Sequence, residues 1–378
     1  MAPSWGHPNL YLGEIFNMAA AGISAPQSQD AAIGQTGAAE FGAPKKYTTE
    51  SIVGLVVLGL AIAWIIWSFA SGPTLFLQVL TIGLSNGALY ALIALGYTMV
   101  YGIIELINFA HGDLFMLGSV LAAIFLEERL NQTKSSPTAW LLLAVVMLSV
   151  MAACAIFNVT IEKLAYRRLR NAPKLAPLIT AVGVSFILQN IGILLNGSAP
   201  NSRASVLPQS SLKVGSIEIR IKYIIVICIT IPLLLLMTWI VQKTRTGKAM
   251  RATAQDRDAS LLMGINVDKI ISYTFALGGA LAGAAGTMFV QVNGQTRYDA
   301  GFRLGLIAFT AAVLGGVGNL LGAVIGGVLI GVIQSLNDSG LGFFPGQKWT
   351  QTVLFGILIL MIIFRPGGIF GTHQQEKV

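Results

Sequence analysis

The stretch that decides the fold is Val100-Tyr101-Gly102-Ile103-Ile104-Glu105-Leu106-Ile107-Asn108-Phe109-Ala110-His111-Gly112-Asp113, which lies between two long apolar segments. It places four polar side chains, Glu105, Asn108, His111 and Asp113, within nine positions. An ionised carboxylate at the bilayer centre costs about 2.5–3.5 kcal/mol on insertion scales, so such groups are rare and usually mark a path or a joint. We call these four residues the helix-break cluster and expect function to depend on it.

The helix-break cluster allows three interpretations. In the first, Asn108 and Asp113 cap and join two half-helices by satisfying free backbone N–H groups. In the second, the polar side chains contact a transported substrate. In the third, the ionisable groups relay protons, which is the least favoured interpretation because no second acidic span continues the path.

The composition around this stretch is that of an integral membrane protein. Of the 378 residues, 54% are hydrophobic and only 11% are charged, whereas soluble domains carry about 25% charged residues. The net charge of +8 could suggest a nucleic-acid partner. The basic residues instead lie in short loops between apolar segments, where anionic lipid and membrane topology account for them. We therefore expect no nucleic-acid partner.

The apolar segments predict an all-α membrane protein, a polytopic bundle of about ten transmembrane helices, each needing about 20 residues. The short third segment is expected to gain length from the polar run before it. Glycines at 315, 316 and 318 interrupt the eighth segment, which predicts a broken or re-entrant helix there. The predicted spans are 51–70, 74–101, 114–126, 139–160, 176–196, 222–241, 268–292, 304–318, 319–336 and 350–364.

Loop charges predict the orientation. The loops 162–175 and 242–269 are rich in Lys and Arg and should be cytoplasmic by the positive-inside rule. Ten spans then place both termini in the cytoplasm, and the alternating apolar residues of 211–222 predict a small hairpin on the outer face. The predicted domains are a disordered cytoplasmic tail at 1–50, an extra N-terminal transmembrane helix at 51–73, a membrane domain at 74–370 and a cytoplasmic C-terminal tail at 371–378.

Polar side chains also follow one face of the predicted helix at 74–101. They form either the wall of a substrate pathway or polar contacts between helices, which are worth about 0.6 kcal/mol per pair. The predicted helix at 176–196 poses the same choice, with packing favoured, through Thr180, Ser185, Gln189 and Asn190. The candidate substrate-pathway residues are Gln78, Ser85, Asn86, Tyr90, Asn108 and His111, with Tyr97 on the same helix face as the first four.

The inner segment 244–266 is the second informative feature. Its Ala-rich stretch from 248 to 263 favours one short helix, which Gly264 can end. Either a soluble partner grips this helix, or it lies on the membrane surface. The chain has no Gly-x-x-x-x-Gly-Lys-Ser/Thr phosphate loop, catalytic triad or metal motif, so we predict no catalytic residue, metal or cofactor.

These features together resemble the permease of ABC importers for branched-chain amino acids. The residues at 87–104 and 107–112 look like that family's first core helix and its following break, and 309–318 and 365–368 also fit. The resemblance runs from about residue 75 to the C-terminus, so the membrane domain would be the permease domain. Glu105 departs from the small residue expected in some members, and residues 1–73 fall outside the resemblance.

The resemblance implies a non-enzymatic transport subunit of the bacterial inner membrane. Its partners would be a second homologous permease, two ATP-binding subunits that carry the ATP, and an extracytoplasmic substrate-binding protein. Rigid-body rocking of helices, driven through the inner segment, would give alternating access. The residues implied in coupling to the ATPases are Arg251, Ala252, Asp256, Ala259, Leu262 and Gly264.

Three alternative functions remain at this point. The family's urea and short-chain amide permeases carry a similar Asn-x-Ala-His-Gly-acid run. A proton-coupled secondary transporter would use Glu105, His111 and Asp113 as its relay, without ATPase partners. A membrane scaffold without transport activity would need its polar face only for stability.

Overall fold

The computed structural model describes residues 63, 66–70, 72–105, 108–130, 137–170, 172–173, 175–202, 205–215, 217–341 and 346–371. The chain divides into two compact units, Met1–Gly54 and Leu55–Val378, and every described residue belongs to the second. The tail predicted at 1–50 and most of the span predicted at 51–70 lie outside the described residues. The tail predicted at 371–378 does so too, except for Gly371.

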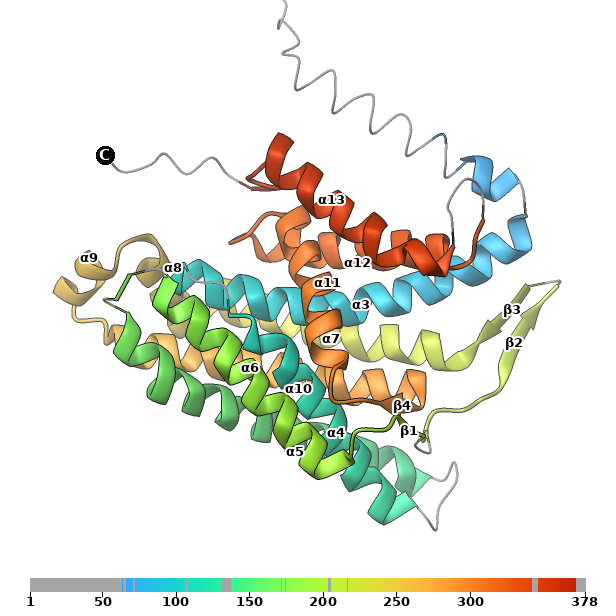
Figure 1. The fold of residues 1–378 in the computed structure, drawn as a ribbon, viewed down its shortest axis with the longest axis horizontal. Coiled ribbons are helices and arrows are strands. Elements are labelled where there is room, and N and C mark those ends of the chain that lie inside the picture. The colour runs from blue at the N-terminus through green and yellow to red at the C-terminus, as the bar shows by residue number, and fades with distance from the viewer. Residues whose placement is uncertain are drawn as a thin grey trace, which may run out of the picture. The chain divides into compact units, whose positions relative to one another are not determined.

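Helix α3 (Pro73–Ile104) is the centre of this unit (Figure 1). It begins at Pro73, where a missing backbone N–H costs nothing, and its Ala-, Leu- and Gly-rich sequence continues for 32 residues. Most of it is buried among other helices, which pack around it on several sides. The other helices are α4 (Ala110–Leu130), α5 (Pro137–Ile161), α6 (Leu175–Asn196), α7 (Ile221–Lys243), α8 (Arg245–Gln255), α9 (Arg257–Leu262), α10 (Val267–Asn293), α11 (Ala300–Gly315), α12 (Leu320–Asp338) and α13 (Thr350–Phe364), with short η turns at Glu162–Tyr166, Arg167–Leu169 and Gln347–Trp349.

The all-α polytopic class is confirmed for the described part of the chain. Seven of its helices are long and apolar enough to cross a membrane, and two shorter apolar helices, Ala110–Leu126 and Ala300–Gly315, accompany them. Each predicted span from 74–101 onward therefore has a helix. The predicted 114–126 span gains its first turn from the polar run, as expected, because α4 begins at Ala110. The total of about ten stays a prediction.

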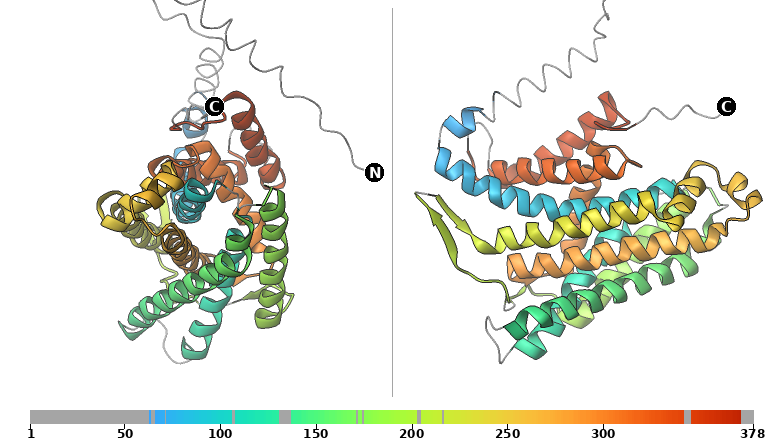
Figure 2. Two further views of the ribbon diagram at one scale, coloured as in Figure 1. Left: turned by 90° about the vertical axis from the view of Figure 1, so that its left-hand side faces the viewer. Right: turned by 180° about the vertical axis from the view of Figure 1, so that it is seen from behind.

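Helix α11 differs from the other helices in direction. In Figure 1 and in the right-hand view of Figure 2, it runs across the long axes of α3, α7 and α10. Its 16 residues extend about 24 Å, less than the roughly 30 Å of a bilayer's hydrocarbon core. It ends where Gly316 adopts a φ of 108°. The re-entrant path of the predicted 304–318 segment stays a prediction.

Helices α3 and α12 approach each other at backbone distance. A Cβ built on Gly87 would lie 2.7 Å from the Cα of Val328, and one on Gly331 would overlap the backbone nitrogen of Gly87. Gly327 packs in the same way against Ala91. Small residues let helices meet closely in a bilayer, where van der Waals contact drives association. We call Gly87, Gly327 and Gly331 the glycine seam.

The two ends of the bundle carry the predicted inner and outer features. The hairpin predicted at 211–222 is confirmed: β2 (Ser211–Val214) pairs antiparallel with β3 (Ile217–Arg220) around Gly215, whose φ is 65°. It joins the start of α7, whereas α8 follows the end of α7, so the two lie at opposite ends (Figure 1). A second pairing joins β1 (Asn201–Ser202) to β4 (Gln295–Thr296).

The two basic loops lie at the same end of the bundle, as the charge pattern predicts. Arg170, which follows α5, forms an ion pair with Asp268 at the start of α10. The C-terminal segment packs against the end of α11, where the N–H groups of Ile369 and Phe370 donate to the carbonyls of Leu314 and Gly315 at 2.9 and 3.1 Å. The assignment of this end to the cytoplasm stays a prediction.

Candidate functional site

The polar stretch of the sequence forms a break between α3 and α4. Helix α3 ends at Ile104, and its C-cap Glu105 has a φ of 57°, a left-handed conformation that costs an L-residue roughly 1–2 kcal/mol. Within the described residues, Glu105 is the one non-glycine with a positive φ. Its side chain is exposed, and its N–H donates to the Tyr101 carbonyl at 2.7 Å. The strain at Glu105 marks the joint.

Asn108 is buried in the break and is held by a residue far along the chain. Its Oδ1 accepts a hydrogen bond of 2.8 Å from the Tyr166 hydroxyl, and its backbone carbonyl accepts one of 3.1 Å from the His111 N–H. Tyr166 ends a π-helical turn, Glu162–Tyr166, which continues α5. Single π turns often occur at functional sites. This turn therefore positions the side chain that fixes Asn108.

Asp113 is fully buried one turn into α4 and binds α6. The Ser185 hydroxyl and the Gln189 amide, the latter at 3.3 Å, donate to its two carboxylate oxygens. Gly301 at the start of α11 packs against the Asp113 backbone, and a Cβ there would lie 2.7 Å from Oδ1. A buried carboxylate must be compensated by donors or a partner charge. The break is thus tied to α6 as well as to α5.

His111 is buried beside the centre of α3. Its ring lies edge-on to the Tyr97 ring, with centroids 4.8 Å apart and an interplanar angle of 67°. It also presses against Gly96, where any side chain would overlap the imidazole. His111 therefore fills a gap in the packing between α3 and α4 that the absent side chain of Gly96 leaves open.

The described residues do not show the predicted capping of the break, which stays a prediction. The side-chain oxygens of Asn108 and Asp113 accept hydrogen bonds from Tyr166, Ser185 and Gln189, and no backbone N–H is seen to donate to them among the described residues. The relay interpretation is not supported either. Glu105 is exposed while His111 and Asp113 are buried, and in the described part of the chain no hydrogen bond links the three.

The four predicted pathway residues on α3 differ in how deeply they are buried. Ser85 and Tyr90 are buried, and Gln78 and Asn86 are half-buried. The Tyr90 hydroxyl donates to Gln334 of α12 at 2.7 Å, so Tyr90 makes a polar contact between two helices. The roles of the four in substrate passage stay predictions.

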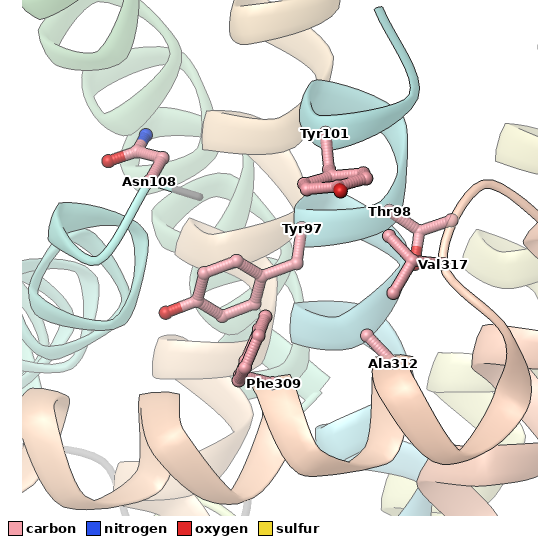
Figure 3. A pocket seen from close by; sticks show the side chains of 7 residues that line it. All are labelled: Tyr97, Thr98, Tyr101, Asn108, Phe309, Ala312 and Val317. Atoms are coloured by element: carbon pink, nitrogen blue, oxygen red, sulfur yellow. The ribbon is translucent and has the colours of Figure 1, made fainter. Parts of the chain in front are cut away.

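A small pocket lies where α3, α11 and the break meet (Figure 3). Two polar atoms in its lining, Thr98 Oγ1 and Asn108 Nδ2, are buried without a hydrogen-bond partner among the described residues. The cavity volume is about 10 Å³, room for about one water, whereas small-molecule sites measure roughly 300–1,000 Å³. In this conformation the pocket is too small to hold an amino acid. The lining residues are Tyr97, Thr98, Tyr101, Asn108, Phe309, Ala312 and Val317.

The inner segment forms two helices, which corrects the single helix predicted for 248–263. Helix α8 ends at Gln255, and Asp256, with φ −156° and ψ 114°, separates it from α9. The Asp256 carboxylate accepts from the Ala259 N–H at 3.0 Å and so caps α9. An N-cap residue has non-helical dihedrals, which is why Asp256 breaks the Ala-rich run. Gly264 ends α9, as predicted, with a φ of 78°.

The predicted coupling residues lie on α8, on α9 and in the turns that end them, and their role in coupling stays a prediction. Arg251 donates to the Val241 carbonyl at the end of α7, and Ala252 is half-buried. Ala259, Leu262 and Gly264 are exposed. Leu261 and Met263 flank Leu262, which is 88% exposed. We call Leu261, Leu262 and Met263 the apolar tip of α9.

Sequence reasoning missed a buried ionic cluster beside the break. Glu162 is fully buried and accepts from Arg170, from Arg167 at 3.4 Å and from the Ser272 hydroxyl at 2.7 Å. In the loop 162–175, Glu162 is the one acidic residue beside five basic residues, and Tyr166 is the one aromatic residue. These two residues could have pointed to the cluster from the sequence alone. Among the described residues, no group of three or more His, Cys, Asp or Glu could hold a metal ion.

Comparisons with known proteins show which family the chain is similar to. The family model described as the permease component of branched-chain amino acid transport systems matches residues 79–363. The chain is 39% identical to the high-affinity branched-chain amino acid transport system permease protein BraD of Pseudomonas aeruginosa, over 80% of this chain and 98% of that protein.

Two further relatives show how far the similarity extends. The permease protein LivH of the same type of system in Escherichia coli K12 is 37% identical, over 80% of this chain and 98% of its own. The autoinducer 2 import system permease protein LsrC of Escherichia coli is 26% identical, over 82% and 85%. No solved structure matches the chain.

Proposed function

This chain belongs to the family of permease components of branched-chain amino acid transport systems, and we propose that it moves branched-chain or related neutral amino acids into the cytoplasm. The observation that carries the proposal is the 39% identity to BraD over 98% of that protein's length. The chain is accordingly a multi-pass permease of the inner membrane.

The proposed assembly contains a second homologous permease, two ATP-binding subunits and an extracytoplasmic binding protein. The chain's own features support this division of labour. It carries no phosphate loop, so ATP hydrolysis belongs to partner subunits. ATP-binding subunits on the cytoplasmic face could displace α8, α9 and the polar break.

We assign docking of an ATP-binding subunit to the apolar tip of α9. Leu262 and Met263 are 88% and 82% exposed, and α9 is polar enough elsewhere to lie outside the membrane. Adjacent exposed apolar side chains at one point of a surface usually mark an interaction site. Ala259 and Leu262 thus remain in the proposed contact, whereas Arg251 and Asp256 hold the shape of α8 and α9.

Passage of substrate requires the break to open. The closed pocket beside Asn108 has room for about one water, so an amino acid cannot pass until α3, α11 or α4 moves. Thr98 and Asn108 would then offer polar atoms that are unpartnered in the closed state among the described residues. Alternating access by rigid-body movement of packed helices provides such opening.

The experiment is uptake of radiolabelled leucine into vesicles that contain this chain together with its genomic neighbours. We expect ATP-dependent uptake that is lost with Leu262→Glu, which buries a charge in the docking surface, and kept with Lys248→Glu on the exposed face of α8. Uptake that survives ATP depletion and collapses with an uncoupler would contradict the proposal. ATP-dependent uptake of urea without leucine would keep the mechanism and change the substrate.

A further inference from the structure

Arg257 makes a contact that neither the fold nor the docking surface requires. It is the first residue of α9, and its Nη2 donates to the carbonyl of Ile103 at 2.6 Å. The two residues are 154 positions apart. Ile103 lies in the last turn of α3, two residues before the strained Glu105. The contact therefore joins the inner segment directly to the helix break.

The chemistry of helix ends explains why a cation lies at this point. Carbonyls in the last turn of a helix lack intrahelical donors and carry partial negative charge. A guanidinium at the end of α3 supplies both the donor and the opposite charge. At the start of α9, by contrast, a cation opposes the helix dipole. The stability of α9 alone thus does not account for Arg257, whereas the end of α3 does.

The second arginine of the segment provides an internal comparison. Arg251 of α8 donates to the Val241 carbonyl in the last turn of α7, only ten positions away. Helix α8 is thereby tied to the span that directly precedes it. Helix α9 is tied instead to α3, the central helix, through Arg257. The two arginines thus contact different spans, although α8 itself also packs against α3 and α10.

We propose that Arg257 is a positioning residue that ties α9 to the last turn of α3, so that displacement of α9 by the ATPases moves the helix break. The inference rests on the proposed function, since it takes ATP-driven transport as given. Helix α9 has six residues, about 9 Å, with Arg257 at one end and the apolar tip at the other. Asp256 fixes its first turn through the Ala259 N–H. It is a short rigid lever between a docking surface and α3.

The experiment uses the full complex, with Arg257→Ala, Arg257→Lys and the control Lys248→Ala, which removes an exposed charge from the same segment. The measurements are the amount of ATPase that copurifies, ATP hydrolysis, and leucine uptake per ATP hydrolysed. Arg257→Ala should keep the ATPases bound while uptake per ATP falls about tenfold, the size expected for one lost hydrogen bond to a charged group. Arg257→Lys should recover part of the loss, and Lys248→Ala should match the wild type.

A second readout needs no substrate. A Cβ at Gly102 meets only the Gly318 Cα, at 3.9 Å, so Gly102→Cys is tolerated one turn before the break. With Cys154→Ala and Cys228→Ser removing the native thiols, ATP should change the rate of maleimide labelling at this site. Arg257→Ala should abolish that change.

Each result bears on the proposal. Unchanged uptake per ATP in Arg257→Ala, or a loss that matches the loss of copurified ATPase, would overturn the inference. So would a labelling rate that ATP leaves unchanged in the Gly102→Cys protein, or changes equally with and without Arg257. If the wild type takes up no leucine while ATP alters labelling only when Arg257 is present, the proposed substrate fails and the inference stands.

Discussion

The glycine seam joins α3 to α12 and the helix break follows the end of α3, but different forces hold the two regions. Along the seam, Gly87 and Gly331 bring two backbones together with no side chain between them. At the break, Asn108 accepts one side-chain hydrogen bond from Tyr166 in the π turn after α5, and Asp113 accepts two from α6. The seam can change only by separating two helices, whereas the break can exchange one hydrogen bond at a time.

This contrast indicates which part of the permease moves. Close-packed interfaces have low compressibility and transmit displacement as rigid bodies. A joint made of side-chain hydrogen bonds, with a strained residue beside it, can adopt a second arrangement at a cost of a few hydrogen bonds. We therefore expect α3 and α12 to move together and the break to be the place where they move against α4.

The largest expected effect is at the seam. Gly331→Leu should prevent stable folding, because its side chain would overlap the backbone of Gly87 and overpacking costs typically 1–3 kcal/mol or more. The matched control is Gly183→Leu on α6, where a Cβ meets nothing within 4 Å. Thermal melting of the detergent-purified protein measures both. Equal melting temperatures would show that the seam tolerates separation.

The next effect is at Asp113. Asp113→Leu removes the acceptor of Ser185 and Gln189 and should destabilise the protein by about 1–3 kcal/mol, the usual penalty for an unsatisfied buried polar group. Uptake should fall with it. Asn190→Leu is the control, because Asn190 is exposed and bonds its own helix at the Phe186 carbonyl. Wild-type melting and uptake in Asp113→Leu would show that the hydrogen bonds from α6 do not hold the break.

A smaller loss is expected at Tyr166. Tyr166→Phe deletes only the hydroxyl that donates to Asn108, worth about 1 kcal/mol net. The break would then hold its closed arrangement less firmly, so ATP hydrolysis without binding protein should rise while stability falls slightly. Tyr273→Phe on α10, which is partly exposed, should change neither quantity. Basal hydrolysis unaffected by Tyr166→Phe would show that this hydrogen bond does not hold the closed state.

The smallest expected effect is at Glu105. Glu105→Gly should stabilise the protein by about 0.5–1 kcal/mol, because glycine relieves the left-handed strain at a φ of 57° and gives back part of that gain in chain entropy. Glu105→Ala keeps the strain and removes the carboxylate, so it separates the two properties. If both variants melt alike, the backbone at this position is not strained in the folded protein.

The sequence predicts much of this fold because hydrophobic length is a strong signal. The spans from 74–101 onward, the hairpin at 211–222 and the ending of α9 at Gly264 all follow from local patterns. The division of the inner segment at Asp256 was missed, since Ala-rich composition favours helix on both sides and one N-cap outweighs it.

The site could be located from the sequence but not assembled. The polar run at 105–113 marks the break, yet its partners Tyr166 and Ser185 are 58 and 72 positions from the residues they bind. Long-range pairs of this kind depend on how helices pack, which periodicity does not report. The contact of Arg257 with Ile103 is a further example, because no local pattern connects two residues 154 positions apart.

The most direct test of the account is a pair of distances measured by pulsed electron paramagnetic resonance in the assembled complex. Labels at Gly102→Cys and Lys163→Cys report on the end of α3 against the π turn whose Tyr166 holds Asn108 of the break. Labels at Leu75→Cys and Leu329→Cys report on α3 against α12. We predict that trapping the ATP-bound state changes the first distance by at least about 2 Å, the scale of helix shifts in switching proteins, and leaves the second unchanged. A second distance that changes as much as the first, or a first distance that stays fixed, would contradict the claim that the break is the moving joint.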